Sequence, residues 1–336
     1  VWINKLMLFF SFLIIINLLL FLFNKQIAQL INLFDYPDKQ RKFHQSNVPL
    51  TGGIIVIINT CLVIIFTLFD NQLNTETVFF KTNKDLKIFL ISSIIFFFIG
   101  FLDDKHNISA TKRFLLILIL LFPIIFLSDN LIINQVRFSF TESTYIIPEY
   151  FSIIWTILCF LLFVNAINMF DGINYQVALY FIYLSLFFIF NNYFNVFFIS
   201  LLIGLVCFLN LNHKNKSFLG DSGTYLLAFI FSYFFIKLYN LPTNIKADHI
   251  VLFMIIPGID LMRLFTKRIF NGKNPFTSDR DHIHHILLEK FSLIKTNLII
   301  QSLIIVPSVL GNYLGFTLEL LIIQLAIYFY LIQFRS

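Results

Sequence analysis

Long apolar runs, separated by short polar segments, follow one another along the whole chain. A helix that crosses a bilayer needs about 20 predominantly apolar residues. Runs of this kind predict eleven transmembrane helices, at residues 6–23, 50–69, 86–102, 114–128, 151–169, 176–190, 196–211, 218–239, 250–265, 297–314 and 316–334. The pattern therefore predicts an all-α, polytopic integral membrane protein, with residues 1–336 forming one membrane domain.

The composition agrees with a membrane protein. Hydrophobic residues make up 58% of the chain, charged residues only 12%, and the mean hydropathy is +0.85. Such a sequence is too apolar for a water-soluble fold. Cys61, Cys159 and Cys207 lie inside apolar runs, without the paired spacing of a metal site or a disulfide framework. The first apolar run is too long for a secretory signal and lacks a cleavage site, so we interpret it as a retained transmembrane helix.

The basic residues predict the orientation in the membrane. The loops after the odd-numbered helices, with the inner end of the ninth helix and the C-terminal tail, carry 17 of the 24 lysines and arginines. By the positive-inside rule these loops face the cytoplasm, and the N-terminus lies outside. Six of the seven histidines fall on the same side. We therefore expect the chemistry in the cytoplasmic loops, near residues 24–49, 103–113, 170–175, 212–221 and 266–296.

Acidic and amide residues gather at the inner ends of the predicted helices. Asp103 and Asp104 follow the third run directly. Neighbouring carboxylates repel unless a cation or a raised pKa relieves them. The pair is either a solvated helix end, or a metal-proximal pair or general base.

Two further motifs lie at the inner end of the fifth helix and at the start of the eighth. Asn165, Asn168 and Asp171 are spaced i, i+3, i+6 and precede Gly172, so that their oxygen atoms can converge on one ligand. Interhelical hydrogen bonds are the structural alternative for these amides. Asp221 lies between glycines at the start of an apolar helix, where a helix N-cap is the simplest interpretation.

The longest inner loop is rich in histidine. Three histidines in four residues resemble a transition-metal site, but His284 and His285 are adjacent, no cysteine accompanies them, and Arg280 and Lys273 would repel a cation. We favour anion binding, with Arg280 contacting phosphate through two parallel hydrogen bonds. In the first inner loop, a basic stretch runs from Arg41 to His44; such stretches serve topology or attract lipid headgroups.

Together these residues suit phosphoryl transfer at a membrane surface. Carboxylate and amide oxygens favour magnesium, with manganese as an alternative, over zinc. The nearby Arg, Lys and His residues suit a diphosphate. The sequence contains no Gly-rich loop ending in Gly-Lys-Ser or Gly-Lys-Thr, so ATP hydrolysis is not indicated, and we expect no nucleic-acid partner.

Five motifs, in order between about residues 30 and 290, resemble one family. These are Asp35-Tyr-Pro37 with Arg41-Lys42-Phe-His44 and Pro49-Leu-Thr-Gly52-Gly53; Gly100-Phe-Leu-Asp103-Asp104; Asn165-Ala-Ile-Asn168-Met-Phe-Asp171-Gly172; Phe218-Leu-Gly220-Asp221-Ser-Gly223; and Pro257-Gly-Ile-Asp260 with Arg268, Pro275-Phe276 and Asp279-Arg280-Asp-His282-Ile-His284-His285. They resemble the polyprenyl-phosphate N-acetylhexosamine-1-phosphate transferases, the WecA and TagO type of glycosyltransferase family 4, related to MraY. One position departs from the family pattern, because Tyr175 replaces a glycine near the expected nucleotide site.

The resemblance implies transfer of a sugar-1-phosphate, such as GlcNAc-1-phosphate, from a UDP-N-acetylhexosamine to undecaprenyl phosphate at a bacterial inner membrane. UMP would leave, and a lipid-linked cell-surface glycan such as O-antigen would begin. Direct attack and a covalent aspartyl intermediate both fit. A catalytically inactive lipid-binding scaffold and a membrane transporter are the alternatives, and a homodimer is one option for assembly.

The resemblance also implies a role for each site residue. Asn168 and Asp221 would hold magnesium, and Asp103, Asp104 and Asp171 would be catalytic. The remaining candidates would bind substrate: Asp35, Arg41, Lys42, His44, Lys112, Asn165, Asn174, Asp260, Arg280, His282, His284 and His285.

Overall fold

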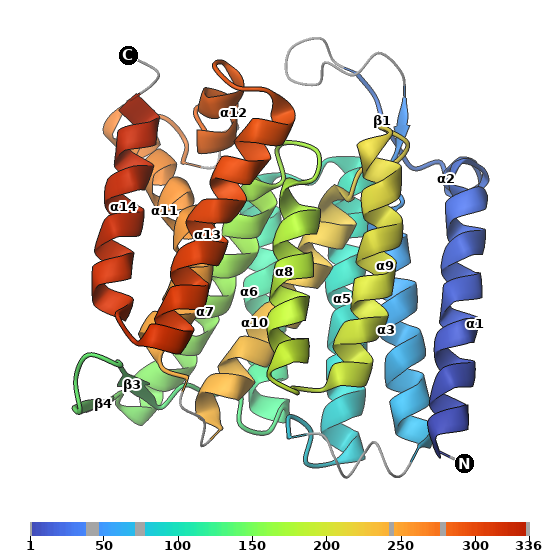
Figure 1. Cartoon of the computed structure of the whole chain (residues 1–336), viewed down its shortest axis with the longest axis horizontal. Coiled ribbons are helices and arrows are strands. Elements are labelled where there is room, and N and C mark those ends of the chain that lie inside the picture. Colours follow the sequence, from blue (N-terminus) through green and yellow to red (C-terminus); the bar gives the residue numbers. More distant parts are fainter. Residues whose placement is uncertain (1, 38–46, 71–77, 242–244, 276–279, 334–336) are drawn as a thin grey trace. The chain divides into compact units, whose positions relative to one another are not determined.

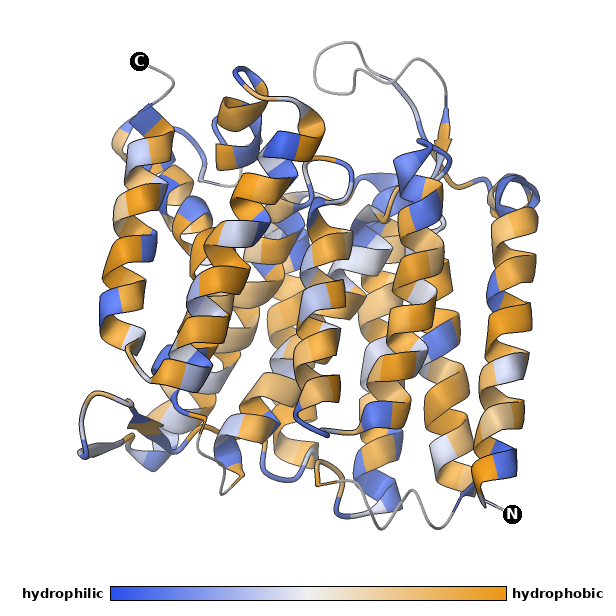
Figure 2. Ribbon diagram, in the orientation of Figure 1, coloured by the Kyte–Doolittle hydropathy of each residue, from blue (hydrophilic) through white to orange (hydrophobic). Residues whose placement is uncertain are grey.

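The chain is predominantly helical in a computed structural model, which describes residues 2–37, 47–70, 78–241, 245–275 and 280–333 (Figure 1). Each of the eleven predicted helices has a counterpart in this part of the chain, and the predicted all-α membrane class is confirmed. Nine of the described helices are long and apolar enough to cross a membrane, while α8 and α14 are apolar but shorter. In Figure 2 the middles of the helices are hydrophobic and polar residues concentrate near their ends.

The chain divides into two compact units. The first comprises residues 1–109, 127–129 and 177–230. Its helices are α1 (Trp2–Leu22), α2 (Asn24–Ile31), α3 (Gly52–Phe69), α5 (Asn83–His106), α8 (Gln176–Phe190), α9 (Asn195–His213) and the first half of α10 (Gly220–Asn240). Within this unit α3 packs against α1, α5 and α9. Asn17 of α1 and Asn59 of α3 exchange side-chain hydrogen bonds of 2.9 and 3.0 Å, which join these helices where no water is available.

The second unit comprises residues 110–126, 130–176 and 231–336. Its elements are α6 (Ala110–Leu127), β3 (Gln135–Arg137), β4 (Thr144–Ile146), α7 (Glu149–Phe170), the second half of α10, α11 (Ala247–Phe270), α12 (Ile283–Leu288), α13 (Leu293–Leu314) and α14 (Thr317–Ile332). Helix α11 packs against α7, α13 and α14. Within this unit, α12 and the β3–β4 hairpin lie at opposite ends of the helices (Figure 1).

Several helices extend beyond their apolar runs. Helix α5 continues through Asp103 and Asp104 to His106 and ends at Asn107, whose φ of 49° is left-handed. Polarity marks where a helix leaves the hydrocarbon, whereas the helix itself ends where its backbone changes conformation. The two aspartates are therefore fixed on a helix rather than placed in a loop.

The apolar runs gave no signal for the short elements. Helices α2 and α12, the β3–β4 hairpin and the hairpin of β1 (Phe34–Asp35) with β2 (Val48–Pro49) all fall in polar segments. Each is too short to span a bilayer. Helix α12 carries part of the histidine motif, so it gives that segment a defined backbone.

Candidate active site

The carboxylate of Asp104 binds the start of helix α10. Its Oδ1 accepts a hydrogen bond from the backbone N–H of Asp221 at 2.7 Å, and its Oδ2 accepts one from the N–H of Ser222 at 3.0 Å. The first N–H groups of a helix have no partner inside the helix, and a negative charge there is favourable. Asp104 therefore caps α10 from another helix, the role that the sequence suggested for Asp221 itself.

Glycines allow this close approach. Gly220 has a φ of +74°, and a Cβ atom there would lie 2.7 Å from Asp104 Oδ2. A Cβ on Gly100 would overlap the backbone carbonyl of Asp221, and one on Gly53 would overlap Ser222 Oγ. Gly53 also donates its N–H to the carbonyl of Leu219 at 3.0 Å. The glycines of two predicted motifs thus hold α3 and α5 against the segment that carries Asp221.

Asp103 has a different environment from its neighbour. It is buried, and its Oδ1 accepts a hydrogen bond from the N–H of Ile108 at 2.8 Å, which fastens the turn after α5. Successive helix residues point about 100° apart, so the two carboxylates face different partners. Asp103 and Asp104 are therefore neighbours in the sequence with different hydrogen-bond partners.

The first inner loop is described only in part. Asp35 lies in β1, opposite Val48 of β2. Arg41, Lys42 and His44 lie outside the described residues. Their predicted contacts with substrate stay predictions.

In the second unit, the motif after α7 meets the histidine motif. A Cβ atom on Gly172 would overlap Nε2 of His284 and would lie 2.6 Å from its Cε1. The His284 ring is stacked on that of His282, with centroids 5.4 Å apart and planes 2° apart. It also makes an edge contact with the His285 ring, whose centroid is 4.3 Å away. Two motifs more than a hundred residues apart in the sequence therefore form one cluster, which we call the Gly172–histidine cluster.

Burial fixes the charge of His284. Its ring is fully buried, and this desolvation holds the pKa of His284 well below its usual range; nearby charge on His285 and His282 acts in the same direction, while Asp260 opposes it. The ring is therefore neutral at physiological pH. A neutral imidazole offers one donor and one acceptor, so His284 contributes hydrogen bonding and shape rather than positive charge.

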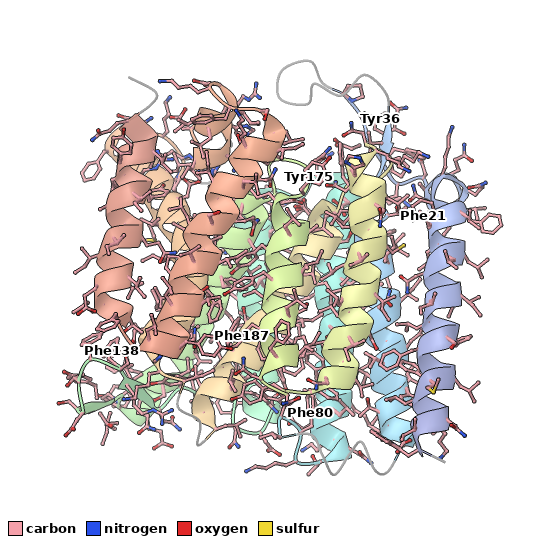
Figure 3. All side chains as sticks on the ribbon, in the orientation of Figure 1. Phe21, Tyr36, Phe80, Phe138, Tyr175 and Phe187 are labelled. Carbon is pink, nitrogen blue, oxygen red and sulfur yellow. The ribbon has the colours of Figure 1, made fainter. Side chains whose placement is uncertain are left out.

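Helix α13 braces the turn that follows Gly172. Asn297 Nδ2 donates to the carbonyl of Asn174 at 3.0 Å, and Gln301 Nε2 donates to the carbonyl of Gln176 at 2.8 Å. Tyr175, which lies between these two anchors at the start of α8 (Figure 3), has a φ of 73°. Tyr175 thus keeps the left-handed backbone that suits the glycine expected from the family pattern, although it adds a side chain there.

This backbone predicts an unusual order of stability for two substitutions. Tyr175→Gly should be more stable than Tyr175→Ala by about 1 kcal/mol, because a left-handed φ strains any residue that carries a Cβ. At an ordinary position alanine would be favoured, since glycine loses more conformational entropy on folding. Thermal unfolding of the two variants in detergent measures the difference. A more stable alanine variant would contradict the left-handed turn.

Asp260 lies at the centre of a buried polar network on α11. Its Oδ2 is 2.8 Å from His282 Nδ1, and its Oδ1 accepts hydrogen bonds from Arg263 Nη2 at 2.8 Å and from the hydroxyl of Tyr328 at 2.7 Å. The backbone N–H of Ile283 adds a fourth contact at 3.2 Å. A buried carboxylate is stable only when it is paired and hydrogen-bonded in this way.

The remaining candidates are exposed or partly buried. Lys112 and Arg280 are exposed. Asn165 is partly buried, and its Nδ2 donates to the carbonyl of Leu161 in its own helix at 2.7 Å. Asn168 and Asp171 are partly buried near the end of α7, in the second unit, whereas Asp221 belongs to the first. Shared metal binding by Asn168 and Asp221 stays a prediction.

The sequence did not identify several residues that support these motifs. Arg263 and Tyr328 bind Asp260, and Asn297 and Gln301 brace the turn. The two amides, spaced i, i+4 in an apolar run, are a signal that the sequence does contain, because amides in membrane helices generally bind a neighbouring element. Nothing in the sequence singles out Tyr328 among the aromatic residues.

Comparisons with known proteins point in the same direction as the motifs. The family model for glycosyl transferase family 4 matches residues 86–239. A relative from Thermotoga maritima is 28% identical over 285 residues, which cover 84% of this chain and 82% of the relative. Relatives from Escherichia coli O157:H7 and Salmonella typhi are each 25% identical, over 79% of this chain and 72% and 71% of their own length. All three are named undecaprenyl-phosphate alpha-N-acetylglucosaminyl 1-phosphate transferase. The family model and these relatives support the assignment of this chain to glycosyl transferase family 4, the family that its motifs resemble.

Proposed function

We propose that this protein transfers an N-acetylhexosamine-1-phosphate, with GlcNAc-1-phosphate as the first candidate, from a UDP-sugar to undecaprenyl phosphate. The observation that carries this proposal is the attachment of Asp104 to the first backbone amides of α10, which joins the aspartate pair of α5 to the segment of Asp221. The names of the relatives supply the acceptor and the sugar. The motifs supply the donor diphosphate, through their resemblance to the family.

The chemistry is the exchange of one phosphoanhydride bond for another. An oxygen of the lipid phosphate attacks the β-phosphorus of the UDP-sugar, the bond from that phosphorus to the bridging oxygen breaks, and UMP leaves with the electron pair. Attack of one anion on another requires alignment and charge neutralisation more than a strong base. Asp103 would orient the lipid phosphate. Arg280 would donate hydrogen bonds to the donor phosphates, as would His282 when both of its ring nitrogens carry protons. Asn165, Asp171 and Asn174 would contact the rest of the donor.

The carboxylate and amide oxygens proposed for the site are ligands that suit magnesium. Among the described residues, no three His, Cys, Asp or Glu side chains gather into a metal-binding group. Magnesium at phosphoryl-transfer sites is commonly held through one or two carboxylates together with substrate phosphates. Asp221 would supply the carboxylate and Asn168 an amide oxygen. The bound ion would neutralise negative charge on the diphosphate.

A doubly labelled donor tests the function directly. Membranes containing the protein would receive undecaprenyl phosphate and UDP-GlcNAc labelled both on the sugar and on the β-phosphorus. We expect both labels to enter the organic phase in equal amounts, with release of UMP. Transfer of the sugar label alone would indicate an ordinary glycosyl transfer. Absence of both labels with every UDP-N-acetylhexosamine supplied would refute the proposal.

Two isosteric substitutions separate metal binding from orientation of the lipid phosphate. Asp221→Asn keeps an oxygen ligand but removes a negative charge, so at limiting magnesium its rate should fall about ten-fold and recover as magnesium rises. Asp103→Asn should not recover with magnesium, because it leaves the proposed metal ligands unchanged. Its defect should shrink at high pH, where the lipid phosphate is fully ionised. Magnesium titrations of the initial rate at about pH 6 and pH 9 measure both effects. The opposite pattern of rescue would exchange the two roles.

We also propose that the end of the second unit that carries α12 faces the cytoplasm. The proposal rests on the basic inner loops and on the separation of α12 from the β3–β4 hairpin along the helices (Figure 1). Asn134 and Lys273 are both exposed, near the hairpin and after α11 respectively. In intact cells an impermeant thiol reagent should label the Asn134→Cys variant but not Lys273→Cys, with unmodified protein as the control for the native cysteines. The reverse labelling would contradict the orientation.

A further inference from the structure

The segment Asp281-His282-Ile283 is fastened to helix α11 at each residue. Arg263 Nη2 donates to the carbonyl of Asp281 at 2.6 Å, and Lys267 pairs with the Asp281 carboxylate at 2.5 Å. Asp260 accepts the N–H of Ile283 and binds the ring of His282. Both the backbone and the side chain of His282 are thereby held in one place.

The contact with Asp260 distinguishes the two nitrogens of the His282 ring. A carboxylate only accepts hydrogen bonds, so Nδ1 must carry a proton to bind Asp260 Oδ2 at 2.8 Å. Stacking against His284 restrains the ring plane. Within the described residues no hydrogen bond engages Nε2. The geometry therefore indicates that Nδ1 anchors the His282 ring on Asp260, whereas Nε2 is left to bind a ligand.

The surroundings of Asp260 do not suit direct contact with substrate. The carboxylate is buried, and it already accepts four hydrogen bonds, from Arg263, Tyr328, His282 and Ile283. Tyr328 also accepts a hydrogen bond from Arg263 Nε at 2.9 Å, so the C-terminal helix α14 closes the network. A substrate phosphate would be repelled by this carboxylate, and it would have to displace a partner to reach it.

We propose that Asp260 is a positioning residue, which holds Nδ1–H of His282 so that Nε2 faces the donor phosphates and, when the ring carries a second proton, donates a hydrogen bond to them. Tyr328 completes this support from α14. The proposal rests on the proposed function, because it names how one of the phosphate-contacting groups is held. It gives Asp260 a role through His282, in place of the direct substrate contact expected from the sequence. It also gives the C-terminal helix a part in the reaction.

A double-mutant cycle tests whether Asp260 acts through His282. His282→Asn retains an N–H donor for Asp260 but has no equivalent of Nε2. We expect Asp260→Asn to lower kcat by about ten- to a hundred-fold, as for loss of a hydrogen bond to a charged group. Tyr328→Phe should lower it only a few-fold, with KM nearly unchanged. Combined with His282→Asn, neither substitution should cause a further loss, because the group that they position is absent.

The controls separate support of the ring from support of the fold. Tyr313→Phe alters a tyrosine that is 76% exposed on α13, and it should leave the rate unchanged. If Asp260→Asn does not fold, the cycle between Tyr328→Phe and His282→Asn tests the positioning role by itself. Losses that add in the double variants, whichever pair is used, would overturn the proposal, because a merely structural role lowers activity with or without His282.

A measurement without turnover keeps this proposal separate from the proposed function. In protein labelled with 15N-histidine, nuclear magnetic resonance in lipid identifies which ring nitrogen of His282 is protonated, with His282→Asn used to assign its signals. We expect a protonated Nδ1 in the wild type and its loss or change in Asp260→Asn. An unprotonated Nδ1 in the wild type would overturn the positioning role even in an active enzyme. A wild type with protonated Nδ1 that transfers no label would refute the function instead.

Discussion

The Asp104→Asn variant is expected to lose about a hundred-fold in transfer rate, and magnesium should not restore it. The carboxylate of Asp104 accepts hydrogen bonds from two N–H groups in the first turn of α10, those of Asp221 and Ser222. An asparagine amide can accept only one of them and turns its own NH2 toward the other. Leaving a buried N–H without an acceptor costs about 1–3 kcal/mol, and the favourable charge at the helix N-terminus is lost as well. Asp104 holds the backbone of Asp221, so a shift of the start of α10 in the variant would also displace the Asp221 carboxylate.

Two readouts distinguish this capping role from metal binding. The Asp104→Asn variant should unfold at a lower temperature in detergent than the wild type, because α10 is buried except at its ends. Asp129→Asn, in the exposed turn after α6, is the matched control and should change neither stability nor rate. Wild-type stability together with recovery at high magnesium would indicate that Asp104 is a metal ligand rather than a cap.

Most of the helices could be predicted because a helix that crosses the bilayer leaves a long apolar run in the sequence. A helix in lipid must be apolar over its whole span, so each long run identified one helix, including α8 and α14. The helix ends were less predictable, because polar residues are tolerated on a helix once it leaves the hydrocarbon. Asp103 and Asp104 illustrate this, since α5 carries them one further turn before it ends at Asn107.

The candidate site could be predicted as a set of residues, but the partners of each side chain could not. The motifs identified Asp104, Asp221 and Gly172, yet nothing in the residue pattern pairs Asp104 with the backbone of α10 or Gly172 with His284. Such contacts depend on how helices distant in sequence pack together. The capping prediction for Asp221 shows the limit, because local sequence identified a helix N-terminus that needs a carboxylate but not the residue that provides it.

Contact between Gly172 and His284 predicts the second large effect. A methyl group on Gly172 would overlap the His284 ring, which is fully buried and stacked on His282. A buried ring that is stacked on His282 and in edge contact with His285 has little room to move, so either the histidine cluster or the turn carrying Asn174 must shift. Displacing a positioned group by about 1 Å can cost about a hundred-fold in rate, so Gly172→Ala should lose about that much. The rate with UDP-GlcNAc and undecaprenyl phosphate measures it.

Gly258→Ala is the matched control for this substitution, because a Cβ at Gly258 on α11 meets no atom within 4 Å. Alanine there should stabilise the helix by about 1 kcal/mol or leave it unchanged, with a wild-type rate. Adding His284→Ala to Gly172→Ala removes the ring that the new methyl group strikes. The double variant should therefore recover thermal stability relative to Gly172→Ala, but not activity, because the central ring of the cluster is gone. A near-wild-type rate for Gly172→Ala alone would contradict this prediction. It would show that the close contact between Gly172 and His284 is not needed for the geometry of the reaction.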